Sequence, residues 1–181
     1  MDPTSRAAGE YEALRDTIRE RGTARVWIAL LGLLGWAALV MATVALDSLP
    51  ILTLVPLLLL AGAFEIVFSI HTGVERVGRY LQVFFEEGAP GWEHQAMEFG
   101  RRFPGRAPDP LFSGVFAAAV CLNFLPVTFT DAYPIEYISL GGLHLLVIGR
   151  ILVARFRAGR QRAEDLERFR QLKEVRTPSH G

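Results

Sequence analysis

The sequence predicts an all-α, polytopic membrane protein with four transmembrane helices in two antiparallel hairpins and with cytosolic or interfacial helical extensions. Four apolar stretches of about 20 residues alternate with charged segments, and each is long enough to cross a bilayer as a helix. Two very short turns, Asp47 to Pro50 and Asp131 to Pro134, join these stretches in pairs. Proline suits the first position of the helix that follows each turn.

Residues 1–25 are the first segment, which we expect to be a cytosolic or interfacial helix. Tyr11, Leu14 and Ile18 recur at helical spacing among charged residues. This pattern is typical of a helix that lies on a membrane surface or packs on another cytosolic helix. The alternative is a solvated helix that only leads into the membrane. Gly22 is the expected end of this helix.

Residues 26–70 are the first predicted transmembrane hairpin. The apolar run that opens it is too long for a typical signal-peptide core, so we interpret it as a retained span. Within that run Gly35, Ala38, Ala42 and Ala45 recur at steps of three and four. Small side chains allow close packing in lipid, so we expect this face to contact a neighbouring helix.

Residues 71–110 form a cytosolic amphipathic helix and a connector. A helix over residues 51–86 would be about 54 Å long, against a hydrocarbon thickness of about 30 Å. Its last turns are therefore expected at or beyond the inner interface. In the connector, Trp92, Ala96 and Phe99 share one face of a short predicted helix, opposite charged residues. This pattern is typical of an interfacial helix.

Residues 111–153 are the second predicted transmembrane hairpin, with spans at 111–130 and 134–153. Residues 154–181 form a charged cytosolic helix and tail. Pairs four residues apart, such as Glu164 with Arg168, support a helix that continues out of the membrane.

The distribution of charge predicts how the chain is threaded. Lysine and arginine total 19 and equal the acidic residues in number, so the net charge indicates no class of partner. However, the two short turns contain no lysine or arginine. The positive-inside rule then places both termini and the connector in the cytoplasm, in a plasma membrane or a bacterial inner membrane. No nucleic-acid partner is expected.

Two ionisable residues lie within the apolar stretches at matching depth. Glu65 and Arg150 are each about 22 Å from the outer turns at helical rise. A charge at such a depth costs about 3 kcal/mol on insertion scales, so we expect the two to form an ion pair. The alternative is that Arg150 reaches the inner phosphates and Glu65 is protonated.

A second match in depth places Asn123 and His144 near the middle of the bilayer. We expect an interhelical hydrogen bond between them, because such bonds are the common reason for polar residues in spans. A proton relay through His144 is the functional alternative. The single cysteine, Cys121, lies in an apolar run and cannot form an intramolecular disulfide bond.

A possible metal site is suggested by two pairs with the spacing His-x-x-x-Glu. His71 with Glu75, and His94 with Glu98, would each lie on one face of a helix, as a site for a divalent metal requires. Surface or interfacial polar residues are the competing interpretation. No cofactor is predicted apart from this possible metal.

Three functions follow from these patterns, and the chain has no strong catalytic motif to choose an enzyme class. The first is a non-catalytic membrane protein, an accessory subunit or scaffold that assembles with partner proteins or with itself. The second is an oligomeric channel or transporter for ions, protons or small solutes, lined by Glu65, His144 and Arg150. The third is a metal-dependent membrane enzyme at the inner interface.

Overall fold

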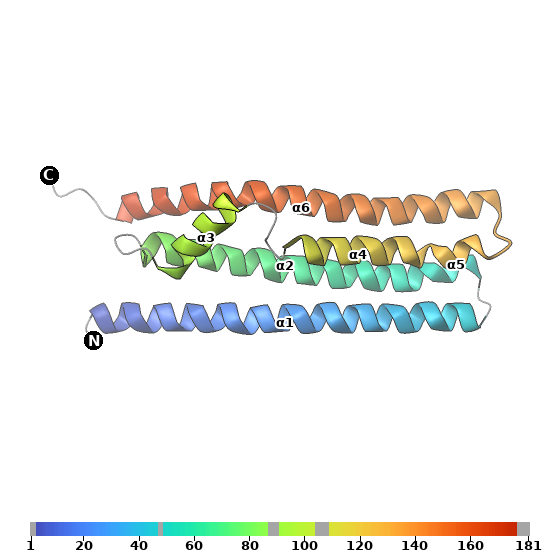
Figure 1. Ribbon diagram of the computed structural model, residues 1–181, viewed down its shortest axis with the longest axis horizontal. Helices are drawn as coiled ribbons and strands as arrows, with labels where there is room; N and C mark the ends of the chain where they lie inside the picture. Colours follow the sequence, from blue (N-terminus) through green and yellow to red (C-terminus); the bar gives the residue numbers. More distant parts are fainter. Residues whose placement is uncertain (1–2, 47–48, 87–90, 104–108, 177–181) are drawn as a thin grey trace. The chain divides into compact units, whose positions relative to one another are not determined.

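The computed structural model describes residues 3–46, 49–86, 91–103 and 109–176, and these residues are almost entirely helical. Figure 1 labels the elements along the chain. They are α1 (Pro3–Ala45), the 3₁₀ helix η1 (Pro50–Thr53), α2 (Leu54–Phe84), α3 (Trp92–Arg102), α4 (Asp109–Asn123), α5 (Leu125–Thr128) and α6 (Pro134–Arg176). Within the described ranges no strand is present, so the all-α class is confirmed.

Three helical segments are long and apolar enough to cross a membrane, which indicates a membrane protein. They are Ser5–Ala45, Pro50–Phe84 and Pro134–Val175. The third predicted span, residues 111–130, is interrupted, and its longest apolar helical stretch is Ser113–Thr128. Among the described residues three long candidate spans are confirmed, and the predicted third span is represented by this shorter apolar helix.

The interruption of the predicted third span has a local cause. Pro126 has no N–H group and cannot bond to the carbonyl of Leu122, so the helix cannot continue regularly there. The backbone closes tight turns instead, with Phe124 N–H donating to Cys121 O at 3.2 Å and Val127 N–H donating to Phe124 O at 3.1 Å.

Gly22 does not end the first helix, contrary to the sequence-based expectation, because α1 continues through it to Ala45. One glycine inside a helix costs about 1 kcal/mol relative to alanine, which the neighbouring helical turns offset. Asp47 and Ser48 of the first predicted turn lie outside the described residues, as does the tail from residue 177.

The chain divides into two compact units. The apolar unit is Arg25–Ser69 with Pro108–Phe156. The charged unit is Met1–Ala24, Ile70–Ala107 and Arg157–Gly181.

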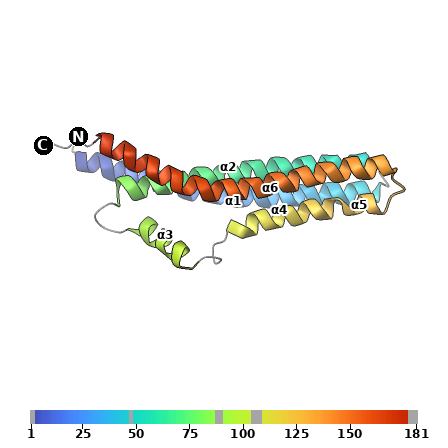
Figure 2. The ribbon, with the colours of Figure 1, turned by 90° about the horizontal axis from the view of Figure 1, so that it is seen from above.

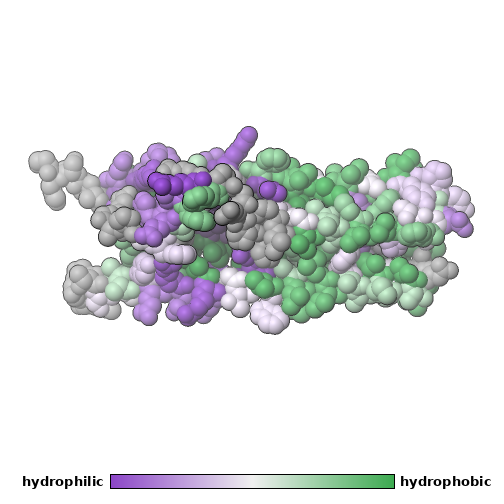
Figure 3. Space-filling model, viewed as in Figure 1, coloured by the Kyte–Doolittle hydropathy of each residue, from purple (hydrophilic) through white to green (hydrophobic). Residues whose placement is uncertain are grey.

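In the apolar unit, segments of α1, α2, α4 and α6 run side by side (Figures 1 and 2). Their contact surface buries a cluster of apolar side chains that includes Leu60, Phe64, Phe116 and Ile151. On the face drawn in Figure 3, this unit's surface is mostly hydrophobic. Large apolar side chains that face outward suit a lipid environment.

In the apolar unit, α1 and α2 approach each other closely. A Cβ atom added to Gly32 would lie 2.6 Å from the Cβ of Ala63, which is closer than real Cβ contacts. Gly35 also faces α2, since its Cβ would lie 3.1 Å from Leu59 Cδ2. The two backbones therefore pack closely through small residues, as helices in lipid commonly do.

The charged unit is held by aromatic packing and by polar contacts between helices. Tyr80 of α2 packs edge-on against Phe169 of α6, with the ring centroids 5.7 Å apart. Its hydroxyl donates to Glu10 Oε1 of α1 at 2.9 Å. Lys173 of α6 donates to the carbonyl of Val83 at 2.8 Å. A cation is favourable there, because the last carbonyls of a helix lack intrahelical donors.

The helix α3 begins against Glu86, two residues after the end of α2. The buried carboxylate of Glu86 accepts a hydrogen bond from the backbone N–H of His94, in the first turn of α3, at 3.1 Å. A Cβ atom at Gly91 would lie 2.6 Å from Glu86 Cδ, so glycine is the residue that leaves room for this cap. An anionic acceptor suits the unbonded N–H groups at a helix N-terminus.

Candidate functional site: buried polar clusters

The apolar unit contains one fully buried amide, Asn123, at the end of α4. Its Oδ1 accepts a hydrogen bond from Trp36 Nε1 of α1 at 3.0 Å. Its Nδ2 donates to the carbonyl of Thr53 in η1 at 3.0 Å and lies 2.9 Å from His144 Nε2 of α6. One side chain that is 0% exposed thus links four segments of the chain. We call Trp36, Thr53, Asn123 and His144 the amide cluster.

The chemistry of these partners fixes the proton positions in the amide cluster. The indole N–H of Trp36 can only donate and the Thr53 carbonyl can only accept, which sets the orientation of the Asn123 amide. The second amide hydrogen then points to His144 Nε2, so this nitrogen must accept. The proton of a neutral His144 therefore sits on Nδ1, which lies 2.8 Å from the carbonyl of Leu140.

A neutral His144 completes every hydrogen bond in the amide cluster. Adding a proton to Nε2 would place two N–H donors against each other and break the bond to Asn123. The edge of the His144 ring also packs near Phe124, with the centroids 5.1 Å apart. The arrangement supports a structural hydrogen bond between α4 and α6 rather than a proton relay.

The structure also brings Glu65 and Arg150 together. Arg150 Nη2 of α6 donates to Glu65 Oε2 of α2 at 2.7 Å. The guanidinium carbon lies 5.8 Å from the ring centroid of Phe68, within the range of a cation–π contact. The side chains are 44% and 46% exposed, so this pair lies on the outer surface of the apolar unit.

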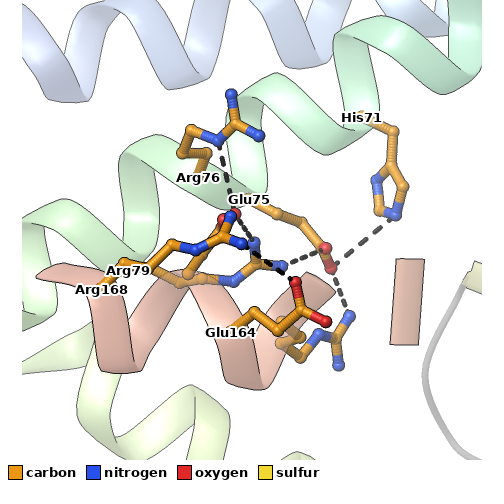
Figure 4. A network of polar contacts seen from close by, with 8 residues as sticks. His71, Glu75, Arg76, Arg79, Glu164 and Arg168 are labelled. Atoms are coloured by element: carbon orange, nitrogen blue, oxygen red, sulfur yellow. Dashed lines mark hydrogen bonds and ion pairs between the residues drawn. The ribbon is translucent and has the colours of Figure 1, made fainter. Parts of the chain in front are cut away.

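The charged unit has its own polar cluster, centred on Arg79 of α2 (Figure 4). The Arg79 side chain is 4% exposed. Its Nη2 donates to Glu75 Oε2 at 2.6 Å, and its Nη1 donates to Asp165 Oδ2 of α6 at 2.8 Å. A buried guanidinium requires such partners, because removing a charge from water is costly.

Further cations surround the same two carboxylates. Arg76 Nε donates to Asp165 at 3.3 Å, and Arg162 of α6 donates to Glu75. His71 Nε2 lies 3.7 Å from Glu75 Oε1. These contacts bind α2 to α6 in the charged unit, and the arginines bring more positive charge than the two acids neutralise.

Both glutamates among the predicted metal ligands accept hydrogen bonds from arginines. Glu75 is close to His71, as its spacing predicts, but it also accepts hydrogen bonds from two arginines. A divalent cation at Glu75 would be repelled by those guanidinium groups. Glu98 Oε1 accepts from Arg102 Nε at 3.0 Å. In the part of the chain that the structure describes, no group of three or more His, Cys, Asp or Glu side chains is arranged to hold a metal.

Several residues of these clusters were not identified from the sequence. They are Trp36, Thr53, Arg79 and Asp165. Trp36 carried a usable signal, because an indole deep in an apolar run needs an acceptor for its N–H. The interhelical bonds of Thr53 with Asn123 and of Arg79 with Asp165 join residues at least 70 positions apart, and spacing within one helix does not reveal such partners.

In comparisons with protein-family models, curated proteins and solved structures, nothing matches this chain. The described helices define the class of the protein: three of them are long and apolar enough to cross a membrane, which indicates an all-helical membrane protein.

Proposed function

We propose that the chain is a non-catalytic integral membrane protein, an accessory subunit or scaffold that assembles with partner proteins or with copies of itself. The observation that carries this proposal is the use of the buried polar groups. Asn123 and His144 in the apolar unit, and Arg79 and Asp165 in the charged unit, bond to one another across helices. Polar groups used in this way stabilise a helical assembly and leave their atoms unavailable for chemistry.

The apolar unit then spans the membrane and the charged unit lies in the cytoplasm. In this arrangement α4 and α5 together make the fourth crossing, because residues 109–128 cover about 30 Å at helical rise. The spans form two antiparallel hairpins, with both termini and the connector inside. The absence of lysine and arginine from the two outer turns supports this threading, in a plasma membrane or a bacterial inner membrane.

Transport is the second candidate, because Glu65 and Arg150 place charge on the surface of the apolar unit. Copies arranged around that surface would line a path for ions, protons or small solutes. The third function, a metal-dependent enzyme using His71, Glu75, His94 and Glu98, has less support, because two arginines already bind Glu75.

Reconstituted vesicles separate the first two functions. The wild-type protein and the variant His144→Ala are compared for proton and ion flux after correct insertion has been verified by protease protection of the charged unit. We expect both to be as tight as empty vesicles. Flux through the wild type that is lost in His144→Ala would overturn the proposal in favour of transport.

Assembly is tested on protein extracted from its native membrane together with the surrounding lipid. We expect a particle that contains more protein than a single 20.1 kDa chain. A particle with one chain and no other protein would contradict an accessory or scaffold role.

A further inference from the structure

The ion pair of Glu65 and Arg150 lies on an otherwise apolar outer face. On α2 the exposed residues around it follow one stripe, Leu58, Gly62, Glu65 and Ser69. On α6 the corresponding stripe is Leu143, Leu146, Arg150 and Val153. We call these two stripes the ion-pair face.

Lipid is a poor neighbour for this face. Nearly half of each charged side chain is exposed, although the pair binds internally at 2.7 Å. In hydrocarbon the exposed oxygen and guanidinium N–H groups have nothing to bind, and charged residues in spans normally face protein or water.

We propose that the ion-pair face is the contact between two copies of this chain, in which the two ion pairs lie against each other. A closed dimer of two copies inserted in the same direction has its two-fold axis along the membrane normal. The line from Arg150 to Glu65 runs from one helix to its neighbour, across the helices, so it lies near the membrane plane. A two-fold rotation about the membrane normal reverses the direction of this line.

The rotation places each charge beside its opposite. Arg150 of one copy lies next to the partner's Glu65, and the reverse holds at the second pair. A face with one cation and one anion at equal depth is therefore complementary to itself, whereas a face with charge of one sign would repel its copy. This charge complementarity favours a second copy over a different protein as the occupant.

The ion-pair face also leaves room for close approach. A Cβ atom added to Gly62 would meet nothing within 4 Å in the chain. The backbone of α2 is thus open beside Glu65, and small residues at this position permit helices to approach closely in lipid. This inference rests on the proposed membrane insertion, and it identifies the assembling partner as a second copy of this chain.

Cysteine cross-linking in vesicles at low protein density tests the proposal. The native Cys121 is changed to Ser, and a single cysteine is introduced as Gly62→Cys. The matched control is Leu31→Cys, which is exposed on α1 at the same depth, since its neighbour Gly32 packs against Ala63. We expect a short bis-maleimide to give dimers with Gly62→Cys and only monomers with Leu31→Cys.

Charge variants test whether the ion pair carries the contact. The doubly neutral variant Glu65→Gln/Arg150→Gln keeps hydrogen-bonding groups, so it is expected to fold while weakening dimerisation at least about tenfold. The reversed variant Glu65→Arg/Arg150→Glu keeps the complementary pattern and is expected to dimerise as the wild type does. Circular dichroism verifies the fold of each variant.

The outcomes distinguish this inference from the proposed function. A monomer in vesicles, or equal cross-linking at both positions, would overturn the dimer while leaving assembly with another protein intact. Cross-linking of Gly62→Cys to a different polypeptide in native membranes, with none between copies, would assign the face to that protein instead. Flux through the vesicles would contradict the proposed function without bearing on the dimer.

Discussion

Replacing Asn123 with Leu tests the structural role of the amide cluster. Leucine has a similar size, so the change mainly removes polar contacts. Interhelical hydrogen bonds in membrane proteins average about 0.6 kcal/mol, so the three contacts of Asn123 account for about 2 kcal/mol. Leaving Trp36 N–H and His144 Nε2 buried without partners adds to this cost, and we expect a total loss of about 2–4 kcal/mol.

Reversible unfolding in mixed micelles with increasing SDS measures this free energy, and in a background with Trp27 and Trp92 changed to Phe the fluorescence of Trp36 reports on the cluster. The control is Leu122→Ala, one residue away on the exposed surface of α4, which should change the free energy of unfolding by less than about 0.5 kcal/mol. If Asn123→Leu were as stable as the wild type, the amide cluster would not hold these helices together.

Three further predictions concern other parts of the molecule. Gly32→Ala should destabilise the chain by about 1–3 kcal/mol, because the added Cβ meets Ala63, whereas Gly22→Ala in the same helix meets nothing and should be neutral or stabilising; SDS unfolding measures both. Arg79→Gln should cost about 1.5–3 kcal/mol by removing its charged hydrogen bonds, since Glu75 and Asp165 each keep a second arginine, whereas the exposed Arg168→Gln should cost less than about 1 kcal/mol. An equal loss for both variants would be contrary to the assigned roles. In a variant whose other two tryptophans are changed to Phe, the fluorescence of Trp92, which is exposed on α3, should be quenched by lipids brominated near the headgroup. If lipids brominated at any depth left this fluorescence unquenched, α3 would not lie at the membrane interface.

The paired polar residues within the apolar unit could be predicted from the sequence. Counting residues from the two turns matched Glu65 with Arg150 and Asn123 with His144, and both pairs are in contact. Depth along a helix is fixed by its constant rise, so it can be read from the chain without knowing the packing.

The packing face of the first span could be predicted only in part. The stripe of small residues from Gly35 was expected to contact a neighbour, and Gly35 does face α2. Ala38, Ala42 and Ala45, however, are exposed, and the tightest contact is made by Gly32. Periodicity identifies residues that share a face, but the neighbour's own small residue, Ala63, decides where two helices approach most closely.

The charged unit was the least predictable part. Arg79 and Asp165 are 86 residues apart in the chain, and each lies among many similar residues. A charge-rich helix offers many possible pairs, and only the packing of α2 on α6 selects the pair that becomes buried. His71 and Glu75 are close, as their spacing predicted, but arginines also bind Glu75 and disfavour a metal ion there.

The central claim is that the polar groups of the apolar unit bind one another, and the ring nitrogens of His144 test it most directly. Solid-state NMR of ¹⁵N-histidine protein in lipid bilayers at neutral pH distinguishes the states of the ring. The claim predicts a neutral ring with its proton on Nδ1 and with Nε2 accepting a hydrogen bond that is lost in Asn123→Leu. A charged ring, or a proton on Nε2, would contradict it.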